Sequence, residues 1–225
     1  MPQFRVKAVM FDLDGTLINS APEITLAANQ MLADLNLPTL PPAQIAHYIG
    51  EGAQVLIKRC LTGELYAEPE VAFYEQAQAL FFNHYAKVAD NSQPYDGVLA
   101  GLQRVWRSGF KLACVTNKPE KFTLPLLAQS GLADFFDCVV SGDSLAKKKP
   151  DPMQLHHICQ KLNVPEYEAM LVGDSITDIT AAHAAGCFII TVPYGYNQGK
   201  PIDESLVDAT INDLTELPSL INLIN

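Results

Sequence analysis

The chain has 225 residues, of which 48% are hydrophobic and 18% are charged, and its formal net charge is −10. This length suits one large domain, or a core domain that carries a smaller one, and the composition is that of a globular protein. The negative charge repels phosphate backbones and anionic lipids, which argues against nucleic-acid and membrane partners. No apolar stretch approaches the ~18–20 residues of a membrane span, and the amino-terminal apolar run is too short for a signal peptide. We therefore expect a cytoplasmic protein.

The five cysteines are odd in number and include no Cys-x-x-Cys pair. Three of them lie in or beside apolar, strand-like runs, namely Cys114, Cys138 and Cys187. Such cysteines behave as small apolar residues, so we expect buried, reduced thiols.

Residues 6–11 form an apolar run that ends abruptly in Asp12 and Asp14. The run is rich in β-branched and aromatic residues, which predicts a strand. A strand that is apolar on both faces is typical of a parallel sheet covered by helices. The two carboxylates would then lie beyond a strand end, where open α/β sheets bind ligands. Two negative charges at one place require a cation or a shared proton.

The next seventy residues indicate helices and no strand. Ser20 and Glu23 fit a capping box, with Pro22 in the first turn. Helical spacing of apolar residues predicts helices over about 24–35, 53–61 and 70–85. We therefore predict an all-helical cap domain over residues 19–93. The chain crosses between domains near residues 18–21 and 91–95, where we expect hinges that let the cap close.

From Tyr95 onward strands and helices alternate. The expected strands are 111–115, 138–140, 170–172 and 188–192, followed by a weaker strand-and-helix tail. The helix before the first of these is expected to bury Leu99, Leu102, Val105 and Trp106 on one face. Such alternation predicts right-handed βαβ units and a parallel sheet. The predicted fold is α/β, a Rossmann-like doubly wound core over residues 1–18 and 94–225 with the cap inserted.

Four polar clusters lie at or just beyond the predicted strand ends. They are Asp12-Leu13-Asp14-Gly15-Thr16, Thr116-Asn117-Lys118, Lys149-Pro150-Asp151-Pro152, and Gly173-Asp174-Ser175-Ile176-Thr177-Asp178. Singly, each has an ordinary explanation as a turn, a helix entry, a solvated loop or a helix N-cap. Together they converge on one crevice of a parallel sheet. Their carboxylates suit a hard cation such as Mg²⁺, and an aspartate can serve as nucleophile in phosphoryl transfer.

These clusters resemble the four motifs of the haloacid dehalogenase superfamily, and the helical insert resembles that superfamily's C1-type cap. The resemblance implies that Asp12 is the nucleophile and also binds Mg²⁺. It implies that Asp14 binds the metal through its backbone carbonyl, while its side chain acts as general acid and then base. Asp174 would be the other metal carboxylate, supported by Asp178 one helical turn later. Because the dehalogenase branch lacks the second aspartate, Asp14 favours a phosphatase, whose alkoxide leaving group gains from protonation.

The resemblance also assigns residues around the phosphate. Thr116 and Lys149 would hold the phosphoryl oxygens, and Lys149 would offset the charge on Asp12. Leu13, Asn117 and Lys118 would line the substrate or phosphate site. A choice between Mg²⁺ and Mn²⁺ stays open, as does a choice between monomer and homodimer.

Finer features resemble one branch, the phosphoglycolate phosphatases. They are Asn19-Ser20-Ala21-Pro22, Ile49-Gly50-Glu51-Gly52-Ala53, Cys114-Val115-Thr116-Asn117-Lys118-Pro119 and Tyr194-Gly195-Tyr196-Asn197, the last without an assigned role. The branch implies hydrolysis of 2-phosphoglycolate to glycolate and phosphate through an aspartyl phosphate. Alternatives are a sugar phosphate, an amino-sugar phosphate or pyrophosphate as substrate, or a phosphomutase.

The substrate of that branch carries a carboxylate, which needs a cationic or N–H partner under the cap. The candidates are Arg59, Lys58 and Lys118, and for each a solvated surface position is an equal alternative. The one partner that these assignments imply is a small phosphorylated metabolite.

Overall fold

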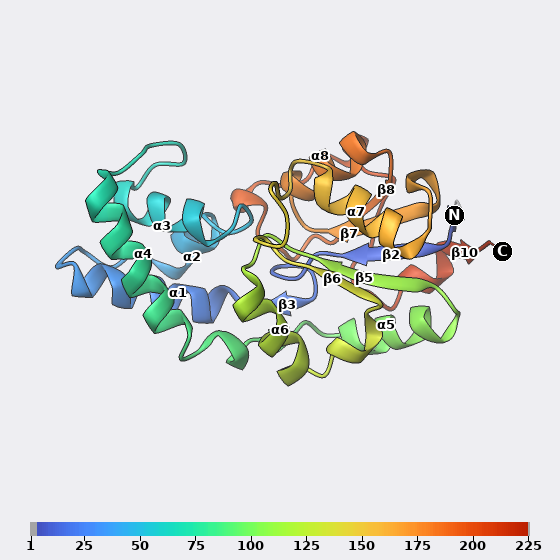
Figure 1. The fold of residues 1–225 in the computed structure, drawn as a ribbon, viewed down its shortest axis with the longest axis horizontal. Coiled ribbons are helices and arrows are strands. Elements are labelled where there is room, and N and C mark those ends of the chain that lie inside the picture. Colours follow the sequence, from blue (N-terminus) through green and yellow to red (C-terminus); the bar gives the residue numbers. More distant parts are fainter. Residues whose placement is uncertain (1–3, 225) are drawn as a thin grey trace.

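The computed structural model describes residues 4–224, and its larger part is built on a parallel sheet (Figure 1). The strand order is β6-β5-β2-β7-β8-β9, and every neighbouring pair is parallel. These strands are β2 (Ala8–Phe11), β5 (Lys111–Val115), β6 (Cys138–Val140), β7 (Ala169–Gly173), β8 (Phe188–Thr191) and β9 (Ala209–Thr210). The chain moves outward from β2 first in one direction and then in the other, so the sheet is doubly wound. The predicted α/β class is confirmed.

Helices cover both faces of this sheet (Figure 1). They are α5 (Val98–Arg107) and α6 (Glu120–Gln129) on one face, and α7 (Met153–Leu162) and α8 (Ile176–Ala185) on the other. Within β2, Val9 and Phe11 pack toward α5 and α6, whereas Ala8 and Met10 pack toward α7 and α8. This alternation explains why the strand is apolar throughout.

The first predicted strand is divided in two. A short strand, β1 (Phe4–Val6), precedes β2 and pairs in parallel with β10 (Ile221–Leu223) in a sheet of its own. Lys7 separates the two strands, and its ammonium pairs with Glu168 at 3.1 Å. The carboxyl-terminal tail contains β9, β10 and short 3₁₀ turns, so the helix expected there is absent from the described residues.

The prediction for the buried face of α5 was right for Leu102 and Val105 and wrong for Leu99 and Trp106. Leu99 and Trp106 are 54% and 51% exposed, whereas Val98 is buried with Leu102 and Val105. Residues 98, 102 and 105 also have helical spacing. Periodicity alone therefore could not decide whether Val98 or Leu99 belongs to the buried face.

The helices between residues 20 and 88 lie beside the sheet and pack around a separate apolar cluster (Figure 1). They are α1 (Ala21–Asp34), α2 (Pro42–Ala46), α3 (Ala53–Thr62) and α4 (Val71–Tyr85). The short helix α2 was not predicted. We refer to these four helices as the cap. The domain limits at residues 19 and 93 stay a prediction.

Two short segments carry the chain between sheet and cap, and they pair with each other. β3 (Ile18–Asn19) and β4 (Gln93–Pro94) form an antiparallel pair. The capping box expected at Ser20 was wrong. Glu23 accepts a hydrogen bond of 2.8 Å from Ser92 Oγ instead, and Ser20 Oγ is buried without a partner among the described residues.

All five cysteines are free and buried, as expected. Among the described residues we find no helix that is both long and apolar enough to cross a membrane.

Candidate active site

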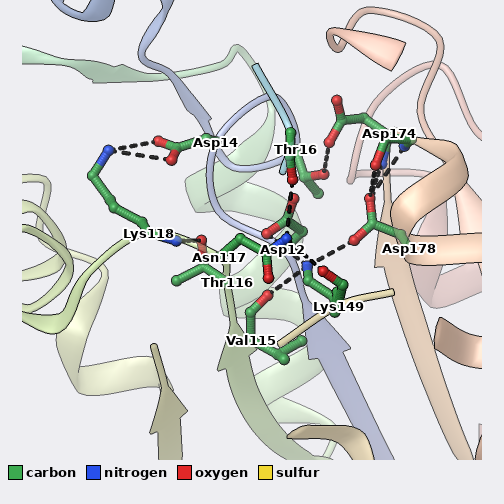
Figure 2. A network of polar contacts seen from close by, with 12 residues as sticks. Asp12, Asp14, Thr16, Val115, Thr116, Asn117, Lys118, Lys149, Asp174 and Asp178 are labelled. Carbon is green, nitrogen blue, oxygen red and sulfur yellow. Dashed lines mark hydrogen bonds and ion pairs between the residues drawn. The ribbon is translucent and has the colours of Figure 1, made fainter. Parts of the chain in front are cut away.

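Three neighbouring strands end at one place and present polar side chains there (Figure 2). Asp12 follows β2, Thr116 follows β5 and Asp174 follows β7. Their exposed fractions are 8%, 1% and 3% respectively, so these groups are largely removed from water. The strand ends thus bring together residues that are 58 to 162 positions apart in the sequence, as the sequence predicted.

Lys149 lies at the centre of this cluster (Figure 2). Its Nζ is 2.8 Å from Asp12 Oδ1, and it donates hydrogen bonds to Asp178 Oδ1 at 2.7 Å and to the Val115 carbonyl at 2.8 Å. Burial opposes the ammonium charge, but the carboxylates of Asp12 and Asp178 outweigh burial and raise the pKa of Lys149. The lysine therefore stays charged and is fixed in one orientation.

Three buried carboxylates cluster here, and two of them, Asp12 and Asp178, contact Lys149. Asp12, Asp174 and Asp178 each offer an oxygen, and the three oxygens lie within 4.8 Å of one another. Burial raises the pKa of Asp12 to about 7, with Lys149 opposing and Asp178 adding to the effect. Burial and the two neighbouring carboxylates also raise the pKa of Asp174 well above its usual range. The negative charge exceeds what one lysine offsets, so an oxygen-binding divalent cation fits here.

The two later aspartates differ in how their oxygens are used. Asp178 accepts hydrogen bonds from Lys149 Nζ, Ser175 Oγ and the Ser175 amide. Asp174 is held by Thr16 Oγ1 at 2.9 Å and by the Tyr196 amide at 2.7 Å, one bond on each oxygen. A carboxylate oxygen that accepts one hydrogen bond keeps capacity for a metal. Asp174 is therefore the better ligand, and Asp178 is suited to orienting Lys149 and α8.

Asp14 lies apart from this group (Figure 2), and its partner Lys118 contacts Tyr85 of the cap. Lys118 Nζ donates to both of its carboxylate oxygens, at 2.9 and 3.2 Å, and also to Tyr85 Oη in α4. Burial opposes the Lys118 charge, but Asp14 and Tyr85 outweigh it and raise the pKa of Lys118. Lys118 is 4% exposed, so the solvated alternative for it was wrong.

A cavity of about 40 Å³ lies between this pair and the cap. It is lined mainly by apolar groups, with Asp12, Asp14, Thr116, Asn117 and Lys118 on the core side. The cap side includes Gly50, Gly52, Ala53, Leu56, Phe81 and Tyr85. The carboxylates thus face a small chamber that core and cap enclose together.

The remaining predicted residues have different surroundings. Asn117 Nδ2 donates to the Gly50 carbonyl at 3.1 Å and to the Lys149 carbonyl at 2.9 Å, so it joins the cap to the core. The Leu13 side chain is fully buried in the apolar core and does not line the cavity. Thr116 Oγ1 accepts from the Lys118 amide at 3.1 Å.

Arg59 and Lys58 do not line the cavity. Arg59 is 1% exposed, so the solvated alternative was wrong for it too. Its guanidinium pairs with Glu51 and donates to the carbonyls of Tyr48 and Leu65, each at 3.1 Å. Lys58 pairs with Glu68 near the surface, at 2.6 Å.

Sequence reasoning missed three contributors to the site, namely Thr16, Tyr85 and Tyr196. Thr16 belongs to the first motif, and its place after Asp-Gly could have indicated a supporting role. Tyr85 contacts Lys118 from the last turn of α4, and no local pattern indicates that contact. Tyr196 lies in a string that the sequence singled out without explaining it.

Comparisons with known proteins agree with this geometry. A family model described as haloacid dehalogenase-like hydrolase matches residues 9–192. The phosphoglycolate phosphatase of Thiobacillus denitrificans is 48% identical over 212 residues, which cover 94% of this chain and 93% of that protein. The phosphoglycolate phosphatase of Nitrosospira multiformis is 48% identical over 217 residues, covering 96% of each. The crystal structure of a predicted phosphoglycolate phosphatase from Haemophilus somnus has a TM-score of 0.89 and 34% identity, over 95% of this chain and 97% of that one.

Proposed function

This chain belongs to the haloacid dehalogenase-like hydrolase family, and from that premise we propose that it is a Mg²⁺-dependent phosphatase whose substrate is 2-phosphoglycolate. The observation that carries the proposal is a buried group in which Asp12 and Asp174 follow the adjacent strands β2 and β7 and Lys149 pairs with Asp12. It combines a carboxylate nucleophile, a fixed positive charge and spare carboxylate oxygens, which are the parts that phosphoryl transfer to an aspartate needs. We place the protein in the cytoplasm, where free buried thiols are the rule.

In this mechanism Asp12 attacks the phosphorus atom, the bond to the leaving oxygen breaks, and an aspartyl phosphate forms. Asp14 gives a proton to the departing glycolate oxygen and later takes one from the water that hydrolyses the aspartyl phosphate. Lys149 and Thr116 hold the transferred oxygens. Asp12, Asp174 and the Asp14 carbonyl would hold Mg²⁺, which when bound offsets the negative charge of the phosphoryl group.

The small chamber supports a two-carbon acid as substrate. A single water needs a cavity of ~10–15 Å³, so a cavity of about 40 Å³ has room for a small group such as a carboxymethyl unit. Lys118 supplies a buried cation at its wall. Gly52 and Ala53 begin α3 at the opposite wall, and the first amides of a helix lack partners within the helix and favour an anion.

A phosphate-release assay over small phosphate esters tests the proposal. The panel is 2-phosphoglycolate, ethyl phosphate, a hexose phosphate, an amino-sugar phosphate and pyrophosphate, with Asp12→Asn as the blank. We expect the highest kcat/KM for 2-phosphoglycolate, loss of turnover in Asp12→Asn, and loss on EDTA treatment that Mg²⁺ restores better than Mn²⁺. Activity that survives both Asp12→Asn and EDTA would rule out the mechanism. Conversion of a sugar phosphate without phosphate release would instead identify a phosphomutase.

A further inference from the structure

The segment from Tyr194 to Asn197 follows β8 and contacts both the acidic cluster and the beginning of the cap. Tyr194 Oη donates to the Thr16 carbonyl at 3.0 Å, and Asn197 Oδ1 accepts from the Ile176 amide, at the start of α8, at 2.9 Å. Two different elements therefore fix the two ends of the segment. Its middle residues, Gly195 and Tyr196, are consequently held in a defined position.

One side of the segment lies against Asp174. The Tyr196 amide donates to Asp174 Oδ2 at 2.7 Å. A Cβ atom at Gly195 would lie 2.2 Å from the same oxygen, so only glycine lets the backbone approach this closely. The position of the Asp174 carboxylate is thus set by backbone atoms of the segment.

The other side of the segment lies against the first turn of α1. Tyr196 Oη accepts hydrogen bonds from the Ser20 amide at 2.9 Å and the Ala21 amide at 3.0 Å, and it donates to Asn19 Oδ1 at 3.1 Å. The first amides of a helix have no partner within the helix, and usually a nearby side chain caps them. Here the hydroxyl of Tyr196, a core residue, accepts the hydrogen bonds at the N-terminus of α1. Ser20 Oγ does not serve this role.

The Tyr196 ring supports the same connection. It is 9% exposed and belongs to the apolar cluster of the cap, together with Ile24 of α1 and Phe122 of α6. A movement of α1 away from the core would therefore part the Tyr196 hydroxyl from two amides and also expose its ring. The residue that holds Asp174 through its amide is the residue that holds α1 through its side chain.

We propose that Tyr196 is a positioning residue that couples closure of the cap to the placement of Asp174. The coupling rests on the proposed function in one respect, since it treats Asp174 as the metal carboxylate. Metal binding at Asp174 would restrain the Tyr196 backbone. The Tyr196 hydroxyl would then stay in place to accept the amides at the N-terminus of α1. Closure of the cap in turn fixes Tyr196 and with it one oxygen of Asp174.

The test compares Tyr196→Phe with Tyr167→Phe by residue-resolved amide hydrogen exchange. Tyr196→Phe removes the hydroxyl and keeps both the ring and the backbone amide that bonds Asp174. Tyr167 is 70% exposed in the 3₁₀ turn Glu166–Glu168, so its variant controls for loss of a tyrosine hydroxyl. In metal-free protein we expect exchange of the Ser20 and Ala21 amides to accelerate about tenfold or more in Tyr196→Phe and to stay unchanged in Tyr167→Phe. Asn19→Ala, a change at an exposed position, should produce a smaller effect of the same sign.

The coupling itself is read from a Mg²⁺ titration of the same proteins. Mg²⁺ should slow exchange of the Ser20 and Ala21 amides in the wild type and in Tyr167→Phe, and this slowing should be lost in Tyr196→Phe. In the phosphatase assay, kcat should fall about tenfold in Tyr196→Phe with KM little changed. Unchanged exchange in metal-free Tyr196→Phe, or equal slowing by Mg²⁺ in all three proteins, would overturn the proposal. Loss of the proposed function would show separately, as absence of turnover in the wild type, and would leave the metal-free comparison intact.

Discussion

Lys118 and Asp14 form an ion pair in which Lys118 Nζ contacts both carboxylate oxygens of Asp14, at 2.9 and 3.2 Å. Both residues line the chamber beneath the cap. In the proposed reaction a substrate carboxylate would compete with Asp14 for the same ammonium group. Substrate recognition and proton transfer are therefore linked through one cation.

Changing Asp14→Asn should lower kcat for 2-phosphoglycolate by ~10²–10⁴-fold, the usual range for losing a general acid-base group. The loss should be much smaller for 4-nitrophenyl phosphate, because its leaving group departs without a proton. Steady-state kinetics with both substrates check this difference. Equal losses for the two substrates would contradict a proton-transfer role for the Asp14 side chain.

Changing Lys118→Met should weaken recognition of the substrate carboxylate. A hydrogen bond to a charged group contributes about 1.5–3 kcal/mol, so kcat/KM for 2-phosphoglycolate should fall by roughly 10–150-fold. Ethyl phosphate, which lacks the carboxylate, should lose far less. Lys58→Met is the matched control, because Lys58 pairs with Glu68 outside the chamber. A similar loss for both substrates would show that Lys118 acts through Asp14 alone.

The meeting of three candidate site residues could be predicted, because each of them directly follows a strand of the sheet. Asp12, Thr116 and Asp174 each follow a strand of one parallel sheet, and such strands place their ends along one edge. Strand patterns are local, so the sequence was enough to predict that these residues meet. The family resemblance then supplied their expected roles.

The contacts between core and cap could not be predicted in the same way. Tyr85 and Lys118, like Tyr196 and Ser20, meet only after the cap has folded and packed on the sheet. The capping-box prediction failed at Ser20 for this reason, since a distant tyrosine supplied the acceptor that a local motif usually provides. Local patterns describe what a helix can form by itself, and tertiary contacts decide what it does form.

Substitution of Arg59 can distinguish whether this residue stabilises the fold or binds the substrate. Its guanidinium donates to the buried carbonyl of Tyr48 and the partly buried carbonyl of Leu65, so Arg59→Met leaves acceptors without partners, at a cost of roughly 1–3 kcal/mol each. We expect the free energy of unfolding to fall by about 2–4 kcal/mol, measured by urea denaturation. At a temperature where the variant is folded, KM for 2-phosphoglycolate should stay within about twofold of the wild type. A large rise in KM with unchanged stability would restore Arg59 as a substrate ligand.

The cap also contains a thiol whose ionisation opposes folding at high pH. Cys60 in α3 is 4% exposed, and burial raises the pKa of its thiol from 9.0 to about 12. Because the folded-state pKa lies above the unfolded value, the stability that this thiol contributes is complete below about pH 9 and is lost as the pH rises toward 12. At pH 8 the folded protein should therefore react with iodoacetamide far more slowly than the urea-unfolded chain, with Cys60 identified by peptide mapping. Labelling of Cys60 at the rate of the unfolded chain would show that the cap opens fully and often, because thiolates react only where solvent reaches them.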